Sequence, residues 1–133
     1  MLGAMSANRP VEAAREEAID AIRSGYTFTE PAIDVGVLSV DDEPVPDARI
    51  RIPLAMLNRH GLISGATGTG KTITLQGLAE QIARAGGPVF AADIKGDLSG
   101  MATAAEPTEK LLARTAKNGQ DWRPAASAIE FYA

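Results

Sequence analysis

The spacing of apolar side chains over residues 10–53 predicts one helix followed by two strands. Apolar residues recur at helical spacing over residues 10–24. Pro10 is suited to the first turn of a helix, and Gly25 is suited to the position just after the last helical turn. "AIDVGVLSV" and "ARIRIPL" alternate as strands do, whereas "DDEPVPD" between them is turn chemistry with two prolines. We expect a helix and a small antiparallel β segment, forming a first unit over residues 1–57. The helix has an apolar stripe that we expect to pack on the rest of the chain, with binding to a partner as the alternative; it comprises Val11, Ala14, Ala18 and Ile22.

After residue 57 the pattern becomes strand, helix, strand. Residues 60–64 suit a short strand, and "PVFAADI" is a continuous apolar run typical of a strand buried on both faces. A second helix is expected around 107–117, and "AIEFYA" begins another strand. This order predicts an α/β fold with a parallel sheet joined by a right-handed crossover. The helix between the strands, over 70–85, offers for burial Ile73, Leu75, Leu78, Ile82 and Ala83.

Composition narrows the class of protein. The 133 residues are 45% hydrophobic and 23% charged, as in an ordinary globular domain, and the absence of cysteine excludes disulfides and thiolate chemistry. No run approaches the roughly 18 apolar residues of a membrane span. We therefore expect a soluble cytoplasmic protein with no membrane partner.

The net charge of −4 is unevenly divided between the two parts of the chain. Residues 1–58 carry 5 basic and 10 acidic side chains, a balance of −5, and residues 59–133 carry 8 and 7, a balance of +1. A surface that neutralises several DNA phosphates needs a cluster of basic side chains, and neither part of the chain has one.

A glycine loop lies between the strand expected at 60–64 and the following helix. It fits the P-loop pattern G-x-x-x-x-G-K-[ST]. Glycines let main-chain N–H groups converge on phosphate oxygens, the lysine reaches the β- and γ-phosphates, and the threonine hydroxyl joins the Mg²⁺ shell. No N-K-x-D guanine signature is present, so ATP with Mg²⁺ is the expected ligand. The nucleotide-binding residues are Gly65, Ala66, Thr67, Gly68, Thr69, Gly70, Lys71 and Thr72, with Lys71 also catalytic and Thr72 at the metal.

Asp93 closes "VFAAD", which superficially resembles a Walker B strand, but it follows Lys71 by only 22 residues. Ile94-Lys95 stands where a hydrolytic ATPase normally places Glu. Because ligands bind at the carboxyl ends of strands in open α/β sheets, Asp93 is a catalytic candidate that would touch Mg²⁺, an attacking water or a substrate hydroxyl. The alternative is a carboxylate that pairs with Lys95 or caps the turn at Gly96.

The tract "NRHGLISGATGTGKTITLQGLAEQIARAGGPVFAADIKGDLSGM" resembles the HerA-like branch of the HerA/FtsK P-loop ATPases, and within it the bacterial helicase HerA-like C-terminal-domain proteins. The resemblance extends over about residues 30–133, and "DIKGDLSG" is its more specific marker. It implies a RecA-like, additional-strand ATPase core that assembles into homo-oligomeric, often hexameric, rings and moves DNA. Asp93 and Lys95 match the D-x-K-G signature of the group, to which the sequence assigns no role.

The later motifs of these families are absent here: a Walker B Asp-Glu pair, a polar sensor and an arginine finger. We therefore expect residues 58–133 to be the first half of a P-loop ATPase domain in a longer protein, without hydrolysis on its own. Two rivals to a DNA translocase or helicase stay open. One is a P-loop small-molecule kinase with Asp93 as base, and the other is a nucleotide-binding regulator that does not hydrolyse ATP.

Overall fold

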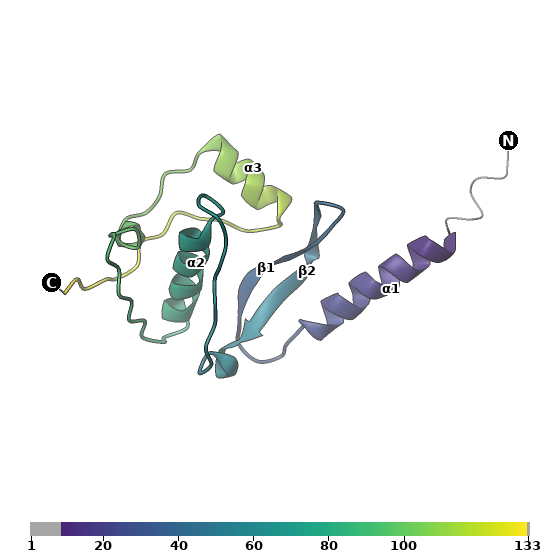
Figure 1. Ribbon diagram of the computed structural model, residues 1–133, viewed down its shortest axis with the longest axis horizontal. Helices are drawn as coiled ribbons and strands as arrows, with labels where there is room; N and C mark the ends of the chain where they lie inside the picture. The colour runs from purple at the N-terminus through teal and green to yellow at the C-terminus, as the bar shows by residue number, and fades with distance from the viewer. Residues whose placement is uncertain (1–8, 133) are drawn as a thin grey trace.

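Over residues 9–132 the chain forms three α-helices and one β-hairpin in an elongated arrangement, with α1 at one end and the carboxyl-terminal segment at the other (Figure 1). The structure is a computed structural model that describes residues 9–132. No helix in this range combines the length and apolar character needed to cross a membrane. In chain order the elements are α1 (Arg9–Gly25), β1 (Ala32–Val40), β2 (Glu43–Pro53), the 3₁₀ turn η1 (Leu54–Met56), α2 (Lys71–Arg84), the 3₁₀ turn η2 (Ser99–Ala102) and α3 (Glu109–Lys117).

β1 and β2 form an antiparallel hairpin, which confirms the two strands expected from the sequence. Its register runs from Ala32 opposite Pro53 to Val40 opposite Glu43. The two residues between the strands, Asp41 and Asp42, have φ values of 52° and 64°, as a two-residue type I′ turn requires. The turn is therefore shorter than the expected loop "DDEPVPD".

β2 contains both prolines that the sequence placed in the loop, Pro44 and Pro46. They are two positions apart, so their nitrogens face the same side of the strand. Val40 and Glu43 flank the two-residue turn, and Pro44, one position further along, faces its nitrogen to the outer edge. In a two-stranded sheet that edge has no ladder partner, and a missing N–H costs nothing there.

α1 packs on β2 through its carboxyl-terminal half. Ile19 is buried at 8% exposure, and two ion pairs join the helix to the hairpin: Arg15 with Asp41 at 2.9 Å and Arg23 with Asp47 at 2.8 Å. The expected apolar stripe is wrong, since Val11 is 67% exposed and Ile19 lies outside that stripe. Helical spacing defines an apolar face, but the way α1 packs on β2 decides which side of that face is buried.

α2 is joined to β1 by the side chain of Gln81. Its Oε1 accepts a hydrogen bond from the Asp34 N–H at 2.7 Å, and its Nε2 donates to the Asp34 carbonyl at 2.9 Å. Because a two-stranded sheet leaves one edge of each strand unpaired, main-chain groups of β1 can bond to a side chain of α2. The Asp34 carboxylate binds Arg49 and Arg51 at 3.2 and 3.1 Å. Asp34 is thus the junction between the helix and the hairpin.

The parallel P-loop sheet expected from the sequence is wrong, because the sheet of the described chain is the two-stranded antiparallel hairpin. Residues 60–64, 88–93 and 128–132 carry no strand assignment. The last expected strand extends to Ala133, which lies outside the described residues, as do residues 1–8 of the first expected unit. The division into 1–57 and 58–133 stays a prediction.

The parallel sheet does not form because the expected strands lack hydrogen-bonding partners and covering layers. A parallel strand needs ladder partners and a layer on both faces, since its side chains are apolar on each. The segments at 60–64 and 88–93 do not pair with one another. Outside the helices and strands, residues 121–132 make a single main-chain hydrogen bond, from the Ser127 N–H to the Met101 carbonyl at 2.8 Å. Their large side chains are open to solvent, as are Ile73 and Leu75 of α2, which the sequence expected to be buried.

Candidate functional site

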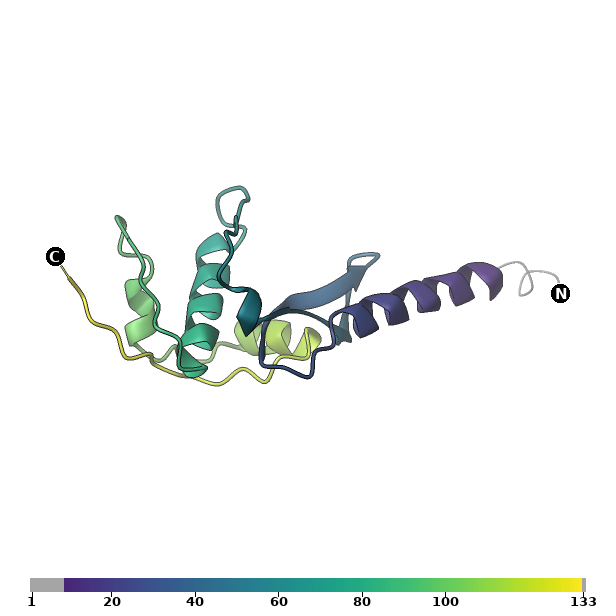
Figure 2. The same cartoon turned by 90° about the horizontal axis from the view of Figure 1, so that it is seen from below.

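The glycine loop, residues 65–72, curls back on itself at the start of α2 (Figure 2). Gly68 and Gly70 have φ values of 80° and 93°, in the left-handed region that glycine adopts without strain. A β-carbon at Gly65 would lie 2.6 Å from Oγ1 of Thr69, so the loop is also too tight there for a side chain. Thr69 closes the curl by donating from Oγ1 to the Ala66 carbonyl at 2.8 Å. The glycines that the sequence singled out therefore each meet a steric requirement.

The loop presents unused hydrogen-bond donors at the helix start. The Thr74 N–H donates to the Gly70 carbonyl at 2.9 Å, whereas the N–H groups of Lys71, Thr72 and Ile73 meet no acceptor among residues 9–132. The first turn of α2 carries no acidic side chain that would occupy them. These donors add to the partial positive charge of the helix amino terminus, so the chemistry of the donor set fits a phosphate group.

Lys71 folds its side chain over the loop. Its Nζ donates to the Ala66 carbonyl at 2.6 Å, and the residue is half-buried. An ammonium has three donors, so this contact leaves two of them for an anion lying against the loop. The geometry is therefore compatible with the phosphate role that the sequence predicts for Lys71.

Asp93 organises the turn that follows the apolar run 88–92. Its carboxylate accepts three main-chain N–H bonds: from Lys95 at 3.2 Å, from Gly96 at 2.9 Å and from Leu98 at 2.7 Å. Gly96 sits in the left-handed region with φ 77°. The bond from Leu98, followed by those from Gly96 and Lys95, lowers the pKa of Asp93 below its ordinary value. The capping role that the sequence left as an alternative is thus observed, and the catalytic role stays a prediction.

A second glutamine ties this turn to α2. Gln76 Nε2 donates to the Asp97 carbonyl at 2.9 Å. Sequence reasoning missed Gln76, although its place one helical turn after Thr72 put it on the same face of α2. The turn at 93–98 is therefore held from inside by Asp93 and from the helix by Gln76.

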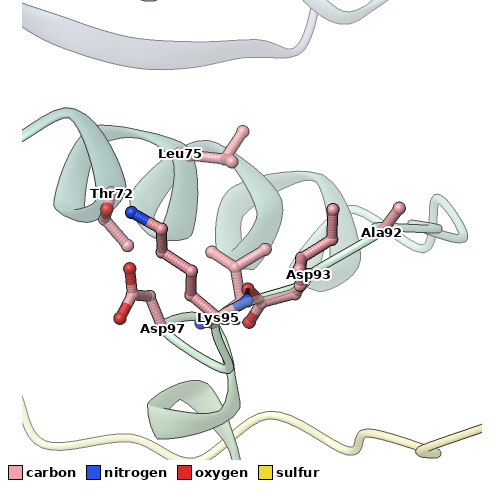
Figure 3. A pocket seen from close by; sticks show the side chains of 8 residues that line it. Thr72, Leu75, Ala92, Asp93, Lys95 and Asp97 are labelled. Carbon is pink, nitrogen blue, oxygen red and sulfur yellow. Dashed lines mark hydrogen bonds between the residues drawn. The ribbon is translucent and has the colours of Figure 1, made fainter. Parts of the chain in front are cut away.

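An open cavity of about 240 Å³ lies between the start of α2 and this turn (Figure 3). It brings together two of the predicted site residues, Thr72 and Asp93, but the remainder of the glycine loop does not line it. In Figure 3 the Lys95 side chain runs along α2 with its ammonium directed toward Thr72, and the Asp97 carboxylate lies on the same side. The lining residues are Thr72, Leu75, Ala92, Asp93, Ile94, Lys95, Asp97 and Leu98.

The capping role of Asp93 predicts a pH dependence. Because its pKa is depressed in the folded chain, the carboxylate stabilises the turn above the ordinary aspartate pKa of about 3.9, and this stabilisation is lost as the pH falls through the lowered value. The amide resonances of Gly96 and Leu98 should titrate together in that acidic range. Asp93→Asn should raise their hydrogen-exchange rates at neutral pH and abolish the titration.

Asp97→Asn is the matched control, because it removes the same charge from the same cavity. The bond from Gln76 is to the main-chain carbonyl of Asp97, so the substitution keeps it. Resonances of Gly96 and Leu98 that do not move between pH 5 and pH 2 in the parent would contradict the capping role.

Comparison with known proteins identifies the family of the chain. Residues 39–133 match the helicase HerA-like C-terminal family. No curated protein and no solved structure matches the chain. The matched range covers more than half of the 133 residues and contains the glycine loop, α2 and the turn at 93–98. The resemblance expected from the sequence is confirmed: the chain belongs to the helicase HerA-like C-terminal family, in the context of the HerA/FtsK-type ATPases.

Proposed function

We propose that the glycine loop binds the phosphates of ATP and that this chain supplies the ATP-binding part of an ATP-driven DNA translocase or helicase. The observation that carries this proposal is the start of α2, where three N–H groups without acceptors among residues 9–132 stand beside the Lys71 ammonium. Gly68 and Gly70 provide the backbone conformation, and the absence of a β-carbon at Gly65 keeps the curl closed. Lys71 would hold a phosphate by a charge-assisted contact.

Mg²⁺ would accompany the nucleotide, and Mg-ATP would supply the phosphoanhydride bond that is cleaved. The Thr72 hydroxyl is the ligand proposed for the metal ion, because it lies on the second residue of α2 and faces the cavity at 93–98. Asp93 is the proposed catalytic carboxylate from the other wall of that cavity. Its three main-chain bonds also hold it in one orientation.

The motor activity is proposed from the family. Membership of a HerA/FtsK-type ATPase family supports the proposed coupling of ATP hydrolysis to movement along DNA. The cytoplasm is the location proposed from the sequence. We propose a homo-oligomeric ring as the assembly, with a hexamer as the first size to test. Since the chain has a net charge of −4 without a basic stripe, contacts with DNA phosphates would come from several copies acting together.

Two rivals stay open. A small-molecule kinase would use Asp93 as base, since Asp93 lines the same cavity as Thr72. A nucleotide-binding regulator would differ from the motor only in turnover.

Titration calorimetry with Mg-ATP and Mg-GTP, followed by ATP turnover with and without duplex DNA, tests the proposal. We expect Mg-ATP to bind more tightly than Mg-GTP and DNA to raise turnover in the assembled protein. Because residues 1–133 alone are expected to show little turnover, binding without turnover by the longer protein expected from the sequence would favour the regulator. Failure to bind either nucleotide would remove the phosphate assignment altogether.

A further inference from the structure

We propose that Lys95 is a second cation of the nucleotide site and contacts the terminal phosphate of the bound nucleoside triphosphate. This inference rests on the proposed function and assigns a role to the D-x-K-G signature. Lys95 lines the same cavity as Thr72, and its ammonium is directed toward Thr72 at the start of α2 (Figure 3). A phosphate held beside Thr72 would lie on the side toward which this ammonium is directed.

The main chain around Lys95 is fixed on both sides. The Lys95 N–H itself donates to Asp93 at 3.2 Å, and the neighbouring Gly96 N–H donates to the same oxygen at 2.9 Å. Two residues further on, the Asp97 carbonyl accepts from Gln76 of α2. Gln76 is therefore a positioning residue, and Asp93, besides its proposed catalytic role, also helps to set the root of the Lys95 side chain relative to α2.

The Lys95 ammonium is available to an anion. Among residues 9–132 it has no carboxylate within 4.0 Å and donates no hydrogen bond. Lys71 is engaged with the Ala66 carbonyl, and Lys117 pairs with Glu43 at 2.9 Å. Lys95 is thus the cation in the cavity that carries no competing contact.

The charges that line the cavity suggest what the Lys95 ammonium does. Two carboxylates, Asp93 and Asp97, line the same wall and would repel a phosphate. Lys95 lines the same cavity and would offset one of these charges for a phosphate bound beside Thr72. A nucleoside diphosphate lacks the terminal phosphate, so the ammonium should distinguish ATP from ADP.

Calorimetric titration of Lys95→Met with Mg-ADP and with a non-hydrolysable Mg-ATP analogue tests the inference. Methionine keeps most of the length of the side chain and removes the ammonium and its charge. We expect affinity for the triphosphate to fall about tenfold, as for loss of one charge-assisted contact, with affinity for Mg-ADP nearly unchanged. Lys95→Arg should restore most of the difference. Lys110→Met, on the exposed face of α3, is the charge-matched control and should bind both nucleotides as the parent does.

The outcomes separate this inference from the proposed function. A parent protein that binds neither nucleotide overturns both. A parent that binds, with Lys95→Met unchanged for both nucleotides, overturns the role of Lys95 alone. An equal loss for the two nucleotides also overturns contact with the terminal phosphate, because the charge would then act on the phosphates that they share. Circular dichroism of Lys95→Met should match the parent, since the residue is exposed.

Discussion

Replacing Lys71 with alanine should weaken the binding of Mg-ATP about ten- to a hundredfold, which corresponds to the loss of a charge-assisted contact of about 1.5–3 kcal/mol. The fold should survive, because the Lys71 ammonium donates only to the Ala66 carbonyl within the loop. That carbonyl also accepts from Thr69, so the substitution leaves it with a partner. Calorimetry of mutant and parent measures the change directly.

Lys110→Ala removes the same charge from an exposed position on α3, remote in sequence from the loop, and is the matched control. It should bind Mg-ATP as the parent does. Equal affinity of Lys71→Ala and the parent would refute the phosphate assignment for the glycine loop. Loss of helical signal in Lys71→Ala would instead show that the lysine holds the loop together, contrary to the contacts observed.

Residues 1–133 studied alone should be marginally stable and self-associate, with little ATPase activity. Their accessible surface is 10760 Å², against about 6,700 Å² expected from the size scaling of a compact monomer of 13.9 kDa. The excess includes apolar side chains of the unpaired segments, such as Leu62 at 89%, Phe90 at 91% and Ile94 at 102% exposure. Unpaired main chain beside exposed apolar groups is a template for association.

Light scattering and thermal melts of the isolated chain test this expectation. Mg-ATP should raise the melting temperature only modestly, since ligand binding stabilises a fold in proportion to its affinity and concentration. Phe90→Lys should reduce scattering, whereas Val11→Lys, at an exposed apolar position of α1, should not. A monomer that melts cooperatively and hydrolyses ATP would contradict the prediction.

Much of the candidate site could be located from the sequence. The glycine loop, Lys71 and Thr72 follow from an eight-residue pattern, because the backbone conformation of the loop and the helix start are local properties. The turn at 93–98 was accessible in part, since Asp93 and Gly96 suggested a cap. Gln76 and the orientation of Lys95 were not, because both depend on α2 and the turn lying side by side.

The sequence by itself determined the elements whose signals lie within a few residues. These are α2, where glycines precede and follow the helix, α3, where the Thr108 side chain accepts from the Leu111 N–H at 3.2 Å, and the antiparallel pairing of β1 with β2. Caps, turns and side-chain alternation act over such distances, and they were sufficient here.

Only the tertiary structure decided what pairs with what. The apolar segments at 60–64 and 88–93 have strand-like sequences, yet no ladder joins them, because a parallel strand forms only where a partner and two covering layers exist. Gln81 reaches Asp34 across 47 residues, and Ile19 is buried because α1 meets β2 along that flank. Such contacts depend on how distant segments meet in space, which no local pattern encodes.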